Sequence, residues 1–196
     1  MTERTYAPEI LTPRLLLRPP RAGDFAAWKE FCADEETMEH LGGVEHEADA
    51  WRSFASFVGA WNLGADAMFS VIERSSDAWI GRIGPWCPHL WPVKEVGWGL
   101  RREYEGQAYA LEAAVASIDY VFDVLGWETV SHLIADENTR SQALARRLGA
   151  APVGEATMPG SLSKYQVTEW RQSRQNWVNR RAQFDALVPQ AAGNPP

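Results

Sequence analysis

The stretch from residue 95 to residue 149 constrains the fold of this chain more than any other segment. Glu95–Leu100 (EVGWGL) predicts a strand, and the apolar residues of 107–125 then recur on one helical face before Gly126. Residues 128–135 (ETVSHLIA) predict the next strand, followed by a helix from Asn138 that ends at Gly149. This strand–helix–strand–helix unit predicts an α/β fold class.

Further elements are expected on both sides of this unit. An antiparallel hairpin is predicted where turn residues 75–77 separate two strand-like runs. Asp24 is expected to cap a helix, and the aromatic stripe of 47–63, which includes Trp51, is expected to pack in the core. The remaining predictions are strands at 15–18, 67–74, 79–85, 151–157 and 164–170 and helices at 24–32, 47–63 and 174–187.

The segment 86–92 (WCPHLWP) joins two of these strands and is rich in proline and tryptophan. Its prolines argue against a central strand, so a loop is expected. Trp86 and Trp91 therefore become candidates for a pocket wall, although core packing is the more common role of any single tryptophan.

Length and charge limit the class of protein. The chain has 196 residues, which suits one domain at 1–188 with an unstructured tail at 189–196. Its net charge of −7 argues against nucleic-acid binding. No apolar run is long enough for a membrane span or a signal peptide, so a cytoplasmic protein is expected. Cys32 and Cys87 are expected to be reduced thiols, and Cys87 and His89 without a second ligand cluster predict no metal.

The turn before the 107–125 helix carries the strongest chemical signal. Gly106 permits unusual φ and a close backbone approach, while Ala108 and Ala110 leave room. Free N–H groups and the helix dipole favour an anion at this end of the helix. The turn therefore suits a pyrophosphate.

In this context the segments GWGLRREYEGQAYALEAAVASIDYVFDVLG and DENTRSQALARRLGA resemble the GCN5-related N-acetyltransferases (GNAT), and among them the ribosomal-protein N-terminal acetyltransferases. The resemblance extends from Leu15 through Trp177. Two positions depart from the common pattern, namely Glu103, where Gln or Arg is frequent, and Ala108, where a second Gly is more common. The resemblance implies a single domain with a twisted, mostly antiparallel sheet of about seven strands, two of them splayed, and flanking helices.

The resemblance also implies acetyl-CoA as cofactor and assigns its contacts. Backbone groups of Trp98 and Leu100 would pair with the pantetheine arm, and Asn138 would touch the same arm unless it is only a helix N-cap. The pyrophosphate would lie in the turn formed by Gly106, Gln107, Ala108, Tyr109 and Ala110.

The reaction then requires a base, an oxyanion donor and an acid. A lysine-type amine attacks only after losing a proton, and Glu95, acting directly or through water, is the expected base unless it is a surface residue. The Trp98 N–H is expected to face the developing oxyanion. The resemblance implies Ser141, which matches the family serine, as the acid, with a purely structural helix-start role as its alternative, and Tyr109 and Tyr165 are weaker candidates.

The acceptor is expected to be a primary amine of a small molecule or a peptide N-terminus, bound near Trp86 and Trp91. Two alternatives stay open: a catalytically silent acyl-CoA sensor, and a transferase of a longer acyl group. His132 alternates with Val130 and Ile134 on one strand face and is expected to be packed or partly exposed and not to be a base. A homodimer is also left open, with Trp127, Trp170 and Trp177 as residues for its interface.

Overall fold

The described strands form a single twisted sheet. In the computed structural model, residues 8–64 and 66–190 are described, and their eight strands are ordered β1-β2-β3-β4-β5-β6-β8-β7. All neighbours are antiparallel except β5 and β6, which are parallel. The strands are β1 (Ile10–Leu11), β2 (Leu15–Arg18), β3 (Phe69–Glu73), β4 (Ala78–Trp86), β5 (Glu95–Leu100), β6 (Thr129–Ala135), β7 (Ala151–Ala156) and β8 (Val167–Ser173).

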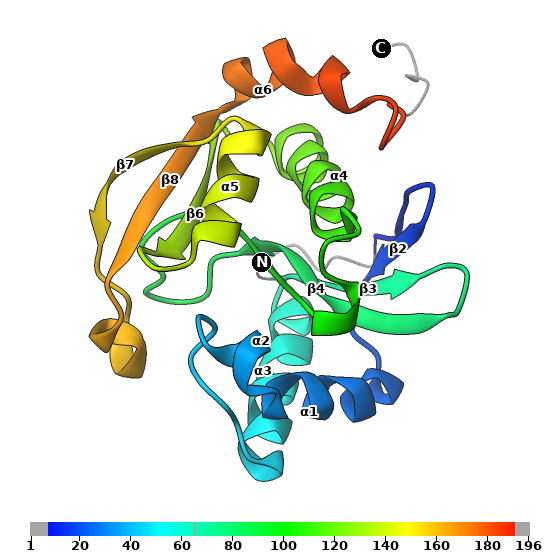
Figure 1. Cartoon of the computed structure of the whole chain (residues 1–196), viewed down its shortest axis with the longest axis vertical. Helices are drawn as coiled ribbons and strands as arrows, with labels where there is room; N and C mark the ends of the chain where they lie inside the picture. The colour runs from blue at the N-terminus through cyan, green and yellow to red at the C-terminus, as the bar shows by residue number, and fades with distance from the viewer. Residues whose placement is uncertain (1–7, 65, 191–196) are drawn as a thin grey trace.

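Helices cover both faces of this sheet (Figure 1). The N-terminal helices α1, α2 and α3 gather on one side, whereas α4 and α5 lie together on the other and α6 follows β8 at the end of the molecule. The helices are η1 (Ala22–Asp24), α1 (Phe25–Ala33), α2 (Glu35–Met38), α3 (Glu47–Asn62), η2 (Arg102–Tyr104), α4 (Tyr109–Asp123), α5 (Thr139–Leu148), η3 (Gly160–Lys164), α6 (Arg174–Arg180) and η4 (Arg181–Phe184).

Two apolar clusters divide the core between the two faces. Phe69 and Val71 of β3 pack with α4 in the larger cluster, while Met68 and Ile72 pack with α1 and α3 in the other. This alternation follows from the two-residue period of side chains in a strand. The mixed α/β fold with flanking helices is the one predicted.

Strands β5 and β6 separate soon after they meet. Their register contains one pair, Glu95↔Ser131. Beyond it the carbonyl oxygen of Val96 is held by the ring of His132, whose Nδ1 lies 2.7 Å away, instead of by the β6 backbone. A side chain thus stands between the two strands, and the expected splay occurs at this place.

Several strand predictions needed correction. The described sheet has one strand more than the seven expected, the short β1, and the strand predicted at 164–170 begins later, as β8 at Val167, after η3 ends at Lys164. Trp86 ends β4 instead of starting a loop. Pro85 is tolerated there because the β3–β4 register ends at Phe69↔Ile83, so the ladder with β3 requires no N–H from Pro85.

The helix predictions differ in their details. The predicted 174–187 helix is divided between α6 and η4. Asp24 stands at the N-cap position of α1, but its side chain does not cap the helix. Its carboxylate instead accepts two hydrogen bonds from Arg18, at 2.7 and 2.8 Å. The α3 stripe is also shifted, since Trp51 is 55% exposed while Phe54 and Phe57 are buried.

The remaining predictions concern the surface and the termini. Trp127, Trp170 and Trp177 are buried within the chain, so they are not available for a dimer interface. Both cysteines are free thiols. Pro189 and Gln190 lie outside the regular elements, and the rest of the predicted tail falls outside the described residues.

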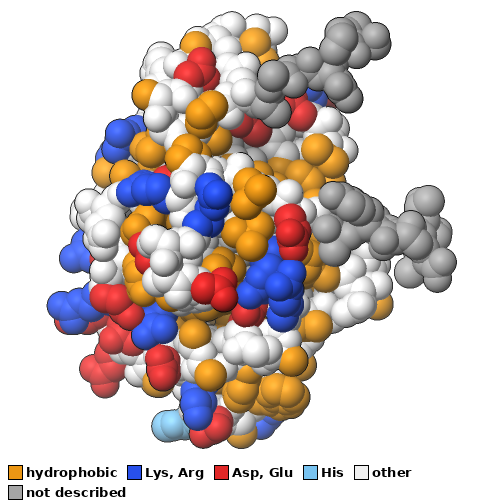
Figure 2. All heavy atoms as spheres, turned by 90° about the vertical axis from the view of Figure 1, so that its right-hand side faces the viewer, with side chains coloured by type: hydrophobic (Ala, Val, Ile, Leu, Met, Phe, Trp, Pro, Cys, Tyr) orange, Lys and Arg blue, Asp and Glu red, His pale blue; other side chains and the backbone are white. Residues whose placement is uncertain are grey.

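The outer surface gives two further findings. On the face seen in Figure 2, basic and acidic side chains are interspersed with apolar ones instead of forming one continuous basic area. Among residues 8–64 and 66–190, no helix is both long enough and apolar enough to cross a bilayer.

Candidate active site

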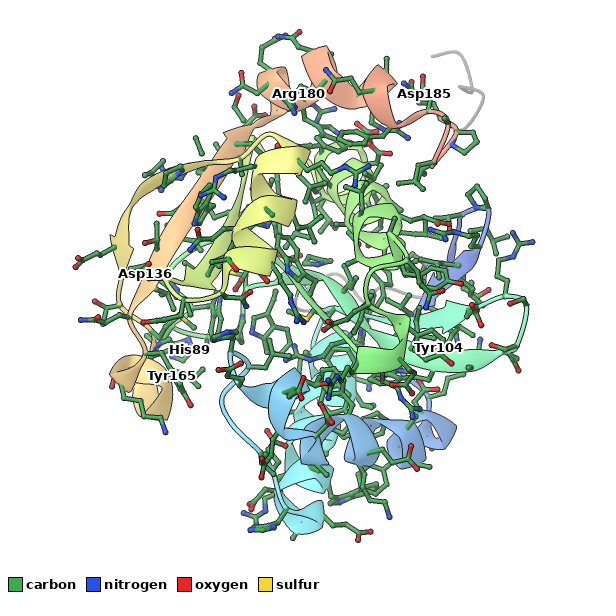
Figure 3. The ribbon with its side chains drawn as sticks, viewed as in Figure 1. His89, Tyr104, Asp136, Tyr165, Arg180 and Asp185 are labelled. Atoms are coloured by element: carbon green, nitrogen blue, oxygen red, sulfur yellow. The ribbon has the colours of Figure 1, made fainter. Side chains whose placement is uncertain are left out.

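A cavity of about 680 Å³ opens where β5 and β6 separate. The helices α1–α3 contribute aromatic and apolar walls, and the sheet contributes polar groups from β4, β5 and β6. Tyr165 and Leu162 border it from the segment between β7 and β8 and approach the Gly42–Gly43 turn after α2 (Figure 3). The cavity therefore brings together segments from both halves of the chain.

Glu95 lies at the start of β5 with its side chain in this cavity. It is 6% exposed, and its carboxylate accepts hydrogen bonds from Trp91 Nε1 at 2.7 Å and from the Leu133 backbone N–H at 3.1 Å. Burial raises the pKa of Glu95 to about 7, although the two hydrogen bonds and the charge of Arg82 lower it in part. Near neutral pH this carboxylate can therefore both take up and release a proton.

Trp86 and Trp91 both line the cavity, as the sequence predicted for a pocket wall. Their ring centroids are 6.3 Å apart in an edge-to-face arrangement, and Trp86 also packs beside Phe57 of α3. Trp91 therefore has two roles in the cavity: its ring forms part of the wall, and its indole N–H donates a hydrogen bond to the Glu95 carboxylate.

Ser141 and Asn138 meet Trp98 on the other side of the cavity. The Asn138 side chain accepts a hydrogen bond from the Ser141 N–H at 3.0 Å and so caps α5. The Trp98 indole donates to Ser141 Oγ at 3.1 Å. The hydroxyl proton of Ser141 thus stays available for another acceptor in the cavity that all three residues line.

The backbone of β5 presents free polar groups to the split. The Lys94 carbonyl accepts from Ser131 of β6, and the Val96 carbonyl accepts from His132, so both face β6. Backbone polar groups of alternate residues in a strand point to the same edge. Those of Trp98 and Leu100 therefore face the same edge, where β6 no longer pairs with β5.

The turn between β5 and α4 has the geometry predicted from its sequence. Gly106 has φ of 72° and Ala108, the N-cap residue of α4, has φ of 62°. No side chain caps this helix, so its first N–H groups are available to an anion. Tyr109 contributes through its backbone alone, because its hydroxyl donates to Glu73.

The two alternative acids and two other titratable residues are placed as follows. Tyr109, the first alternative acid, is directed toward β3 by that bond to Glu73, whereas Tyr165, the second, lines the cavity. His132 is 1% exposed, as expected for a packed residue, and burial lowers its pKa to about 4. Burial raises the pKa of Cys32, a further lining residue, to about 12, so its thiol stays protonated.

Sequence reasoning missed two polar features of the cavity. Arg82 stands on β4 inside it, and a charged residue in the apolar run WIGRIGP was the signal that could have revealed it. On the helical side, Trp28 Nε1 donates to Ser53 Oγ at 3.2 Å, and Ser53 donates to Glu45 at 2.6 Å. Nothing in the spacing of these three residues indicates that they meet.

Comparison with known proteins agrees with this arrangement. The family model of the acetyltransferase (GNAT) domain matches residues 14–151. The uncharacterised N-acetyltransferase YnaD of Bacillus subtilis (strain 168) is 32% identical over 142 residues, which are 71% of this chain and 81% of that protein.

Solved structures are also similar. The crystal structure of the acetyltransferase from Agrobacterium tumefaciens str. C58 is 28% identical, with a TM-score of 0.76 over 89% of this chain and 99% of that one. Spermidine N-acetyltransferase from Vibrio cholerae, in complex with CoA and spermine, is 17% identical with a TM-score of 0.68, over 85% of this chain and 99% of that one.

Proposed function

The chain belongs to the GNAT acetyltransferase family and is an acetyl-CoA-dependent acyltransferase, and from this premise we propose that it acetylates a primary amine by direct attack in a ternary complex. The amine belongs to a small molecule or to a peptide N-terminus. The observation that carries this proposal is the buried Glu95 carboxylate, with its pKa near 7, in a cavity at the β5–β6 split.

The residues present fit acetyl-CoA. The uncapped α4 N-terminus and the backbone N–H groups of 106–110 would hold the pyrophosphate, in a turn where a Cβ built on Gly106 meets no atom within 4 Å. The backbone groups of Trp98 and Leu100, together with Asn138, would hold the pantetheine arm along the split. The cofactor supplies a thioester carbonyl with a thiolate leaving group.

Glu95 acts as the general base. Its carboxylate takes a proton from the ammonium form of the acceptor, directly or through one water, and so frees the lone pair for attack. Trp91 and Leu133 hold both carboxylate oxygens in place through their hydrogen bonds. Trp86 and Trp91 form the wall against which the acceptor packs.

Trp98 and Ser141 serve the other end of the reaction. The Trp98 backbone N–H, on the edge that faces the split, stabilises the charge that develops on the carbonyl oxygen. Ser141 donates its hydroxyl proton to the departing sulfur, because its oxygen already accepts from the Trp98 indole.

A thiol-release assay tests the proposed function. Acetyl-CoA is incubated with the protein and a panel of amines and peptides, and free thiol is measured. Release that depends on the amine supports the proposal. Cofactor binding without release for every acceptor would favour the sensor alternative. Larger thermal shifts with propionyl- or succinyl-CoA than with acetyl-CoA would favour a longer acyl group, because preferential binding raises apparent stability.

A further inference from the structure

The side chains of Arg82 and Glu95 extend from the same face of the sheet. In the β4–β5 register Arg82 pairs with Gly99 and Trp86 pairs with Glu95, with Gly84 and Gly97 between them. Side chains two residues apart share a face, so Arg82, Trp86 and Glu95 all lie on the face covered by α1–α3. All three line the cavity.

The guanidinium lies against Met68, which also borders Gly97 of β5. Its Nη1 lies 3.0 Å from Met68 Sδ, and Met68 Cε is the atom nearest to a Cβ built on Gly97, at 2.6 Å. A Cβ at Gly97 would in turn lie 3.5 Å from Glu95 Oε1. Met68 thus lies between the guanidinium and Gly97, which is two residues along β5 from Glu95, the expected base.

The Arg82 guanidinium has no carboxylate partner within the described residues. No ion pair of 4.0 Å or less is formed by this group, and its buried Nε has no hydrogen-bond partner. Its other contact is the Trp28 ring, 5.6 Å from Cζ. The charges of Glu95 and Glu45 attract the guanidinium from a distance. Both carboxylates take their hydrogen bonds from other donors: Glu45 from Ser53, and Glu95 from Trp91 and the Leu133 N–H. An unpartnered buried donor of this kind is costly, and no carboxylate of the described residues offsets the guanidinium charge at short range.

We propose that Arg82 binds a carboxylate of the acceptor, so that the preferred substrates are amines that also carry a carboxylate. This inference rests on the proposed function and names its substrate class. The planar guanidinium matches a carboxylate through two parallel hydrogen bonds. The acceptor would place its amine at Glu95 and its carboxylate at Arg82, with Trp86, which pairs with Glu95, beside its amine end.

A carboxylate fits this cavity better than a phosphate. Glu45 and Glu95 already place two acidic groups in it, and a phosphate monoester carries close to two negative charges at neutral pH. A single negative charge meets less repulsion from these groups. The aromatic walls contributed by Trp28, Phe31 and Phe57 suit an apolar body next to that charge.

The test compares matched acceptors in the thiol-release assay. L-phenylalanine, L-methionine, β-alanine and γ-aminobutyrate, which vary the spacing between amine and carboxylate, are each measured against their carboxamides. For the best acceptor, the wild-type protein is expected to prefer the carboxylate in kcat/KM by about tenfold or more. In R82Q, kcat/KM for the carboxylate acceptor should fall roughly 10- to 100-fold, while kcat/KM for its carboxamide should change less than threefold.

Two variants control this comparison. R82K keeps the charge without the fork and should fall between the wild type and R82Q. R52Q removes an exposed arginine of α3 and should leave the preference unchanged. Equal kcat/KM for both members of every pair in the wild type, or an equal loss for both in R82Q, overturns the inference, the second result indicating that Arg82 acts on Glu95 or on packing.

A binding measurement separates this inference from the proposed function. Thermal unfolding with CoA is followed in the presence of N-acetylated forms of the same acids and of their carboxamides. If no amine releases thiol but the N-acetyl acids still stabilise the wild type and not R82Q, the subsite is supported and the proposed function fails. If only carboxamides are acetylated, the proposed function holds and the inference fails. If neither turnover nor stabilisation depends on the carboxylate, the inference fails as well.

Discussion

At the scale of single residues, Glu95 shows how burial brings the pKa of an ordinary carboxylate close to neutral pH. An exposed glutamate is fully ionised at neutral pH, whereas removal of this side chain from water raises its pKa to about 7. Two hydrogen bonds to its oxygens keep the ionised form accessible. This environment, unfavourable to the ionised form, is what suits Glu95 to the role of base proposed above.

The variant Glu95→Gln tests this role. Because an amide cannot take a proton, kcat/KM should fall roughly 100- to 10,000-fold. The wild type should lose activity as the pH falls through 7, and the variant should lose that dependence. Initial rates of thiol release from pH 6 to 9 measure both effects. Turnover within about threefold of the wild type across this range would remove Glu95 as the base.

The same variant predicts a change in stability. The pKa of Glu95 is higher in the folded protein than its ordinary value of 4.5, so the folded state binds the proton more tightly than the unfolded chain. The contribution of Glu95 to stability is then fully present below about pH 4.5 and decreases as the pH rises toward and through 7. Urea unfolding at pH 5 and pH 8 should show that E95Q gains relative to the wild type at the higher pH.

Ala108 is a second residue whose backbone is informative. It adopts φ of 62° at the N-cap of α4, where an alanine Cβ is disfavoured. Ala108→Gly should therefore stabilise the protein by about 0.5–1 kcal/mol and keep acetyl-CoA binding. The matched change Ala110→Gly, within the helix, should destabilise it by a similar amount. Urea unfolding measures both, and a loss of stability in A108G would contradict the strain argument.

At the scale of elements, the contact between β5 and the N-terminal helices depends on two glycines. Gly99 lies under α1 and the turn after α2, and a Cβ there would meet Leu41 Cδ1 at 2.9 Å and Phe31 Cζ at 3.0 Å. A Cβ at Gly97 would meet the flexible end of Met68 at 2.6 Å. The helices can approach the sheet this closely because β5 has no side chain at these two places.

Gly99→Ala should therefore destabilise the protein by about 1–3 kcal/mol, because the buried Phe31 ring has little freedom to move. Gly97→Ala should lower the free energy of unfolding by less than Gly99→Ala does, since the Met68 side chain can rotate away. Gly59→Ala on α3 meets no atom within 4 Å and should instead stabilise the helix by about 0.5–1 kcal/mol. Chemical unfolding of the three variants checks this order, and an equal cost for G97A and G99A would contradict it.

At the scale of the whole molecule, the C-terminal segment is fastened to the central helix through Arg181. Its side chain is buried and bonds to Asp119 of α4, to Asp185 and to the Val188 carbonyl, each at 2.7 to 2.8 Å. Trp177 also donates to Asp119 at 2.8 Å. These contacts join the last elements of the chain to the helix that begins at the expected cofactor turn.

Arg181→Met should lower the free energy of unfolding by about 2–3 kcal/mol, because the partly buried Asp119 carboxylate loses its cationic partner and keeps only the Trp177 hydrogen bond. The double variant D119N/R181M should recover part of this loss, since it removes the unpaired charge. R52Q, which breaks an exposed pair, should cost less than about 0.5 kcal/mol. Urea unfolding measures all three, and additive losses in the double variant would argue against the pairing.

Local patterns in the sequence were sufficient for several of these features. The strand, turn and helix around Gly106 appear as predicted, because an apolar period, a glycine and a run of small residues act within a few positions of one another. Asn138 caps α5 for the same reason. Tertiary contacts can override such a local pattern, as for Asp24, whose carboxylate binds Arg18 and Ser70 instead of capping α1.

The sequence by itself therefore determined the α/β class, the order of its main elements, the turn suited to a pyrophosphate and the choice of Glu95 and Ser141 as candidates. The tertiary structure alone decided which side chains share the cavity, including Arg82 on β4 and the Trp91 bond to Glu95. It also decided how deeply Glu95 is buried, and with that its pKa. The physical reason is that periodicity and capping are local interactions, whereas burial and cross-strand contacts depend on strand register and on how helices pack across the sheet.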